Sequence, residues 1–241
     1  MMKLVTSVRG ICVLLVAPLL TFVVSLLAII YLVVLRGSAR KAQMLPRMWG
    51  KIILTISGVR VTVEGLENIE PDRPYIFAAN HQSQFDIFAM QGCFRVDFRW
   101  LAKKELFRIP LFGKAMRLAG YVAVDRSHGR EALKSLKEAA ERIAAGTSVV
   151  LFPEGTRSRD GRLQPFKTGG MVLAIKSGVP LVPVGISGTF QVLPKGRLLA
   201  QPGRVVIRVG RPLETKALTA GQKQELAERL HGEVARLLAQ G

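Results

Sequence analysis

Short apolar runs alternate with amphipathic segments along most of the chain. Apolar residues at helical spacing predict helices over about 86–94, 132–143 and 219–238. The short apolar runs are typical of strands and lie at 59–63, 75–79, 99–102, 120–124, 148–152, 181–186 and 205–209. Strands that alternate with helices favour a parallel sheet. We therefore expect residues 58–241 to form a single α/β domain, with a mostly parallel central sheet flanked by helices.

The N-terminal region has a different pattern. No charged residue occurs from Gly10 to Leu35, and about 20 apolar residues in a helix are enough to cross the hydrocarbon core of a bilayer. Pro18 either kinks a single span or divides the run into a re-entrant pair of helices. Residues 36–57 then alternate basic and apolar positions, which predicts an amphipathic helix, either in the membrane interface or packed on the domain. We assign residues 1–57 to this membrane-associated region.

Basic residues greatly outnumber acidic ones. The chain has 35 Lys and Arg against 17 Asp and Glu, a net charge of +18, which attracts nucleic acid, an anionic bilayer surface or a phosphorylated substrate. Five basic residues follow the uncharged run at positions 36–51, and two precede it. Positive residues favour the cytoplasmic side of a span. We therefore expect the protein at the cell membrane, on its inner face, with the domain in the cytoplasm.

A histidine and a carboxylate follow the predicted strand at 75–79. If a helix begins near residue 83 or 84, Asp86 lies in its first turn and can reach back to the ring of His81. A carboxylate that binds one ring nitrogen fixes the tautomer and leaves the other nitrogen as a base. No nearby Cys or second His offers the spacing of metal ligands. The pair predicts acid–base chemistry without a metal or cofactor.

Cationic residues follow several other predicted strands. Gly155, Thr156 and Arg157 offer a tight turn, a hydroxyl and a guanidinium whose planar fork suits phosphate. Glu154, just before them, either accepts from a substrate hydroxyl or holds its own loop by accepting backbone N–H bonds. Further cations near strand ends are Lys103, Lys104, Arg126 and Lys167. Because the carboxyl ends of parallel strands share one sheet edge, these residues predict an anionic ligand beside a histidine base.

Four segments, taken in order, resemble the motifs of the glycerolipid acyltransferases, the 1-acylglycerol-3-phosphate acyltransferase family. They are Asn80-His81 with Asp86, then Gly120 to Arg126, Phe152 to Ser158, and Val179 to Val184. Two further segments, 102–106 and 166–169, are also similar to the family. The resemblance covers about residues 75–187, and residues 189–241 carry no such motif. It implies that residues 58–241 are an acyltransferase domain.

The resemblance also implies a reaction. His81 acts as general base on the sn-2 hydroxyl of lysophosphatidic acid, Asp86 orients it, and the freed oxygen attacks an acyl thioester directly. The donor is acyl-coenzyme A or acyl carrier protein, the product is phosphatidic acid, and no cofactor takes part. The family pattern assigns substrate binding to Lys103, Lys104, Arg126, Glu154, Gly155, Thr156, Arg157 and Lys167.

Other functions stay open at this point. The same chemistry suits a lyso-ornithine lipid or another lysophospholipid, although the arginine set favours a phosphomonoester acceptor. A different class is a non-enzymatic, basic adaptor bound to the membrane. The intact His81 and Asp86 pair argues against it, and because the sequence has no recognisable nucleic-acid module, we expect no nucleic-acid partner.

Overall fold

A single twisted sheet organises the protein. The computed structural model describes residues 2–125 and 130–240. Its strand order is β1-β7-β6-β2-β5-β3-β4, and every neighbouring pair is parallel except β6–β7. The strands are β1 (Val59–Glu64), β2 (Ile76–Ala79), β3 (Arg99–Lys103), β4 (Val122–Val124), β5 (Val149–Leu151), β6 (Leu181–Ser187) and β7 (Gly203–Val209). The predicted mostly parallel sheet is confirmed.

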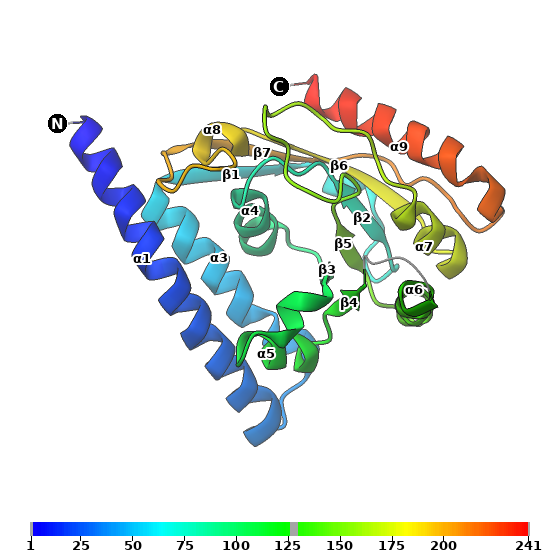
Figure 1. Cartoon of the computed structure of the whole chain (residues 1–241), viewed down its shortest axis with the longest axis horizontal. Helices are drawn as coiled ribbons and strands as arrows, with labels where there is room; N and C mark the ends of the chain where they lie inside the picture. The colour runs from blue at the N-terminus through cyan, green and yellow to red at the C-terminus, as the bar shows by residue number, and fades with distance from the viewer. Residues whose placement is uncertain (1, 126–129, 241) are drawn as a thin grey trace.

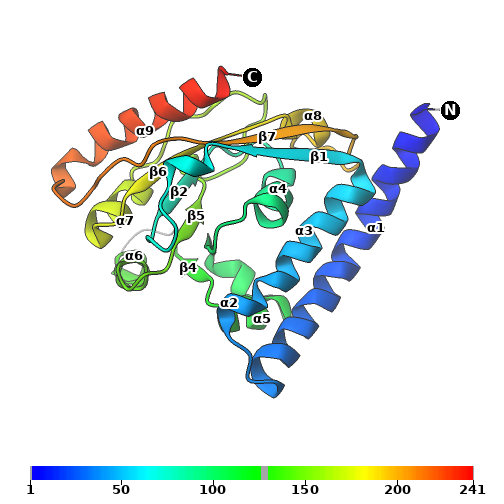
Figure 2. The ribbon, with the colours of Figure 1, turned by 180° about the vertical axis from the view of Figure 1, so that it is seen from behind.

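Helices cover both faces of the sheet (Figures 1 and 2). Helices α3 and α4 contribute to the core on one face, and α6, α7 and α9 to the core on the other. The helices are α1 (Met2–Ile29), α2 (Ala39–Ala42), α3 (Met44–Ser57), α4 (Phe85–Cys93), α5 (Phe112–Leu118), α6 (Arg130–Ala144), α7 (Gly169–Ser177), α8 (Thr189–Val192) and α9 (Lys223–Leu238). The domain is thus the expected sheet flanked by helices.

Strand β2 shows why the central strands are apolar without interruption. Phe77 and Ala79 belong to the core on the α3 and α4 side. Ile76 and Ala78 belong to the opposite core, under α6, α7 and α9. Successive side chains in a strand point to opposite faces, and here both faces are covered. A strand between two helical layers therefore needs apolar residues at every position.

Helix α1 runs through Pro18 without a break. One side packs along α3 and α5 and buries Val13, Ser25 and Ala28, while the other leaves large apolar side chains exposed (Leu15, Leu19 and Phe22 among them). The helix is long and apolar enough to cross a membrane, by length and composition. The division at Pro18 that the sequence allowed is not present.

The amphipathic helix predicted at 36–57 is divided into α2 and α3, and α3, the longer part, packs on the domain. Helix α3 crosses α4 at two glycines, and the approach is close, because a Cβ on Gly50 would lie 2.7 Å from Gly92 N and 2.8 Å from Phe88 O. The indole of Trp49 donates to Thr21 Oγ1 of α1 at 3.0 Å. Helix α3 therefore joins α1 to the sheet.

We expect Gly50→Ala to lower the free energy of unfolding by about 1–3 kcal/mol, since the added methyl group meets backbone atoms rather than movable side chains. Gly232→Ala, at an exposed position of α9 with no atom within 4 Å of the added Cβ, is the matched control. It should raise stability by up to about 1 kcal/mol through helix propensity. Urea unfolding in detergent measures both, and equal effects would contradict the close crossing.

Candidate active site

The loop after β2 is fixed to the neighbouring strand β6 by Asn80. Its side chain is fully buried. Asn80 Oδ1 accepts from the N–H of Ile186 at 2.7 Å, and Asn80 Nδ2 donates to the carbonyl of Ile186 at 2.9 Å. An amide side chain offers a donor and an acceptor together, so it continues the pairing of β2 and β6 beyond the last strand residue. The backbone of His81 is thereby placed at the carboxyl edge of the sheet.

His81 and Asp86 form the predicted pair. Asp86 lies in the first turn of α4, where the helix N-terminus favours negative charge. Asp86 Oδ2 lies 2.7 Å from His81 Nδ1 and also accepts from the N–H groups of Gln82 and Ser83, at 2.7 and 2.9 Å. A carboxylate accepts only, so Nδ1 carries the proton and Nε2 is the basic nitrogen. Phe152 stacks on the ring, with centroids 3.9 Å apart.

Glu154 joins the histidine loop to the turn that follows β5. It is buried, its Oε1 accepts from the N–H of His81 at 2.6 Å, and its Oε2 accepts from the N–H of Gln164 at 3.2 Å. The N–H of Ser158 donates to the carbonyl of His81 at 2.8 Å, which closes the link. Of the two roles that the sequence allowed, this geometry is that of loop holding. Each carboxylate oxygen of Glu154 accepts a hydrogen bond from a backbone N–H group.

Burial raises the pKa of Glu154 to about 7, and its two backbone N–H bonds offset only part of the rise. Between its ordinary pKa of 4.5 and about 7, the unfolded chain releases this proton while the folded chain keeps it. Stability therefore falls as pH rises through this window. We expect Glu154→Gln to lessen the loss of stability between pH 5 and 8 by on the order of 3 kcal/mol.

Urea unfolding at both pH values measures this change. Glu228→Gln, at an exposed position of α9, is the control and should leave the pH dependence as it is. A Glu154→Gln protein with the same pH dependence as the unchanged chain would show that the carboxyl group titrates at its ordinary pH in the folded state.

The turn after β5 gathers cationic groups. Gly155 has a φ of +76°, a region that favours glycine, and a Cβ there would lie 3.1 Å from Lys167 Nζ. Thr156 is exposed, and its Oγ1 accepts from Lys195 Nζ at 3.2 Å. Among the residues that the structure describes, no hydrogen bond or ion pair of the Arg157 guanidinium is found. The Arg157 turn (residues 153–158) thus carries Arg157 and has Lys167 beside it. Its Glu154 and Ser158 are hydrogen-bonded to the backbone of His81.

Two of the other predicted cations lie at the end of β3. Lys103 is exposed, with Nζ 3.5 Å from Glu105 Oε1. Lys104 binds Asp125, its Nζ lying 3.1 Å from Asp125 Oδ2. Arg126 lies outside the described residues. The ends of β2 and β5, which are neighbours in the sheet, therefore carry His81 and the Arg157 turn, and the end of β3, next to β5, carries the two lysines.

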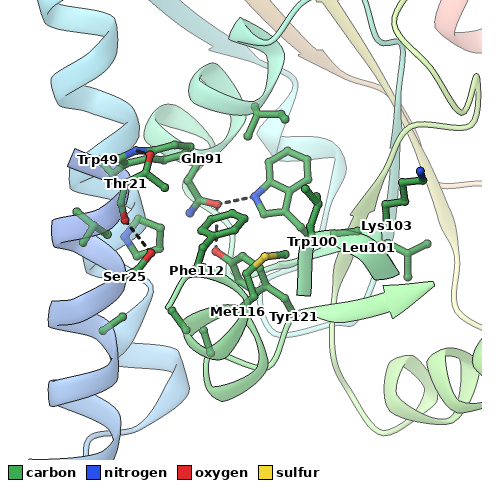
Figure 3. Close-up of a pocket in the computed structure, with 18 of the residues that line it drawn as sticks. Thr21, Ser25, Trp49, Gln91, Trp100, Leu101, Lys103, Phe112, Met116 and Tyr121 are labelled. Atoms are coloured by element: carbon green, nitrogen blue, oxygen red, sulfur yellow. Dashed lines mark hydrogen bonds between the residues drawn. The ribbon is translucent and has the colours of Figure 1, made fainter. Parts of the chain in front are cut away.

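An apolar cavity of about 290 Å³ reaches the histidine. Its walls come from α1, α3, α4, β3 and α5, and His81, Phe152 and Lys103 line it as well. Thr21 and Ser25 of α1 lie on one side and Lys103 on the opposite side (Figure 3). Sequence reasoning did not find this cavity, because its walls come from segments far apart along the chain.

A few polar groups interrupt the apolar wall. Trp100 Nε1 donates to Gln91 Oε1 at 2.7 Å, and the Tyr121 hydroxyl lies 3.5 Å from the same oxygen (Figure 3). Burial raises the pKa of Tyr121, so its hydroxyl stays neutral. Trp100 and Tyr121 are thus hydrogen-bonded to Gln91, and the apolar remainder of the lining is suited to a hydrocarbon chain.

Several known proteins are similar to this chain. A family model described as "Acyltransferase" matches residues 60–187. The 1-acyl-sn-glycerol-3-phosphate acyltransferase of Pseudomonas aeruginosa is 33% identical over 186 residues, which are 77% of this chain and 71% of that protein. The chloroplastic enzyme BAT2 of Brassica napus is 36% identical over 199 residues, 80% of this chain and 57% of that protein. A Chlamydomonas reinhardtii relative is 39% identical, over 64% of this chain and 47% of its own length.

The fold has a close counterpart among solved structures. The crystal structure of the 1-acyl-sn-glycerophosphate (LPA) acyltransferase PlsC from Thermotoga maritima matches with a TM-score of 0.72 and 32% identity, covering 94% of this chain and 96% of that one. Against several plant and algal relatives, the chain spans only about half of their length. With the four motifs, the fold and these matches in agreement, the chain belongs to the 1-acyl-sn-glycerol-3-phosphate acyltransferase family.

Proposed function

We propose that this protein transfers a fatty acyl group from a thioester to the sn-2 hydroxyl of lysophosphatidic acid, giving phosphatidic acid. The observation that carries the proposal is the His81–Asp86 pair at the wall of an apolar cavity. The names of the similar enzymes support the acceptor, because they are 1-acyl-sn-glycerol-3-phosphate acyltransferases. Acyl-coenzyme A and acyl carrier protein both supply the required thioester.

The chemical steps follow from the pair. His81 Nε2 takes the proton of the acceptor hydroxyl, and the oxygen attacks the thioester carbonyl. The carbon–sulfur bond then breaks, and the leaving thiolate takes the proton from the imidazolium to become the free thiol. Asp86, at 2.7 Å from Nδ1, stabilises the imidazolium between these steps. Transfer is direct, so no acyl-enzyme forms.

The cavity and the Arg157 turn bind different substrates. The cavity is lined mainly by apolar side chains and holds the acyl chain of the thioester, with its reacting carbon near His81. The Arg157 turn, which is bonded to the backbone of His81, holds the acceptor phosphate. A guanidinium binds phosphate through two parallel N–H bonds, which places the glycerol hydroxyl between phosphate and base.

Helix α1 supports a location at the bilayer surface. Its inner side is packed on the domain from Gly10, where a Cβ would lie 3.0 Å from Leu199 Cβ, to Ala28. Its outer side exposes Leu15, Leu19 and Phe22, at 68%, 63% and 53%. We infer that this outer side enters one leaflet while the helix stays on the domain. The basic residues at 36–51 support a location on the cytoplasmic leaflet, because its anionic lipids attract them.

An acceptor competition tests the proposal. The purified protein in detergent receives an oleoyl thioester together with equal amounts of lysophosphatidic acid and lyso-ornithine lipid. Phosphatidic acid as the main product supports the proposed acceptor. Product mainly from the ornithine lipid would keep the acyl transfer but replace the acceptor. If neither product formed with oleoyl-coenzyme A or with oleoyl acyl carrier protein as the donor, the non-enzymatic adaptor would become the better explanation.

A further inference from the structure

The segment after α8 lies against both the histidine loop and the Arg157 turn, although it carries none of the four motifs. Ser83 Oγ donates to the carbonyl of Leu193 at 2.7 Å, and Ser83 forms an isolated antiparallel bridge with Pro194. One residue further on, Lys195 Nζ donates to Thr156 Oγ1 and to the carbonyl of Arg157, both at 3.2 Å. This segment therefore fixes Lys195 at the Arg157 turn, close to the histidine loop.

The charge of Lys195 has no acidic partner among the side chains that the structure describes. Both acceptors of its ammonium group are neutral oxygens. Within that part of the chain no Asp or Glu oxygen lies within ion-pair distance of Lys195, Arg157 or Lys167. Elsewhere, by contrast, cations such as Arg208 and Lys104 bind carboxylates, at 3.0 and 3.1 Å. Three cations around one turn leave a positive potential that an anion can neutralise.

We propose that Lys195 is a further phosphate-binding residue, which makes the acceptor site selective for a phosphomonoester. The inference rests on the proposed function and extends it to a residue outside the family motifs. An ammonium has three donors, and the two contacts described leave a third for a phosphate oxygen at the Arg157 turn. A phosphomonoester carries a charge of about −1.5 to −2 near pH 7, whereas a phosphodiester carries a single charge. A further cation therefore favours the monoester.

The alternative is that Lys195 only braces the turn through its two hydrogen bonds. Lys195→Gln separates the two roles, because an amide still donates hydrogen bonds but has no charge. Lys195→Arg restores the charge. Arg197→Gln, at an exposed position of the same segment, controls for the general loss of one positive charge.

The test compares two acceptors, lysophosphatidic acid and lysophosphatidylglycerol, in detergent micelles with a saturating oleoyl thioester. We expect Lys195→Gln to raise KM for lysophosphatidic acid about 10-fold with kcat within about 2-fold, and to leave KM for the phosphodiester within about 2-fold. Lys195→Arg should recover most of the loss, and Arg197→Gln should match the unchanged protein. Equal effects on both acceptors, or a fall in kcat that Lys195→Arg does not restore, would overturn the proposal, as would no effect at all.

A binding measurement without donor keeps this inference separate from the proposed function. Calorimetry with lysophosphatidic acid alone should show affinity about 10-fold weaker for Lys195→Gln than for the unchanged protein. In the unchanged protein, affinity should rise as the phosphate loses its second proton near pH 6, and this rise should be smaller in the variant. Equal affinities at every pH would overturn the role of Lys195 even if phosphatidic acid forms. Absence of phosphatidic acid from the unchanged protein would instead count against the proposed function.

Discussion

His81→Ala is expected to lower kcat for acyl transfer by about 10²–10⁴-fold, the usual contribution of a positioned general base. The loss should fall on kcat more than on KM for the acceptor, because the ring takes up a proton only as the reaction proceeds. Steady-state assays with lysophosphatidic acid and an oleoyl thioester measure both constants.

Asp86→Asn should cost activity of a similar order, for a different reason. Asp86 Oδ2 accepts from three donors, namely His81 Nδ1 and the N–H groups of Gln82 and Ser83. An amide in its place can turn its NH₂ group toward the ring, which favours the tautomer with the proton on Nε2 and removes the base. If both variants kept near-normal kcat while folded, the pair would have no part in the chemistry.

Arg157→Ala is expected to raise KM for lysophosphatidic acid by roughly 10–100-fold, the range for loss of charge-assisted hydrogen bonds to an anion. Its unfolding midpoint should stay near that of the unchanged protein, because no partner of the guanidinium is found among the described residues. Acceptor titrations and urea unfolding measure the two effects.

Arg159→Ala is the matched control, since Arg159 is exposed two positions further along the same loop. It should change KM by less than about 3-fold. Loss of kcat in Arg157→Ala with acceptor affinity unchanged would contradict a phosphate-binding role for Arg157.

The parts of the site that sequence reasoning predicted depend on local patterns and on the pairing of parallel strands. An uninterrupted apolar run predicted β2, and the helix expected after it places Asp86 in the first turn of α4, within reach of His81. The motif after β5 likewise brings Glu154 to the backbone of His81, because β2 and β5 are neighbours in the sheet. A parallel sheet and its loops are enough to make these contacts.

The parts that were not predicted depend on how loops and helices outside the parallel strands pack together. Lys195 is 39 positions from Thr156, and its segment reaches the site through Ser83, which no periodicity indicates. The cavity is bounded by Thr21 and Trp49 from two N-terminal helices. The sequence indicated a membrane segment for the first, and left open whether the second lies in the membrane interface or packs on the domain. Their apolar character predicted a lipid environment, but which side of α1 packs on the domain is decided by the tertiary fold.

The most direct test of the central claim is a single-turnover measurement on the purified chain. Labelled oleoyl thioester is mixed with excess protein, first alone and then with lysophosphatidic acid, beside His81→Ala at equal folded concentration. We predict that no label is bound covalently without acceptor, that phosphatidic acid forms when the acceptor is added, and that His81→Ala forms it at least 100-fold more slowly. An acyl-enzyme without acceptor, or equal rates for the two proteins, would contradict direct transfer by a histidine base.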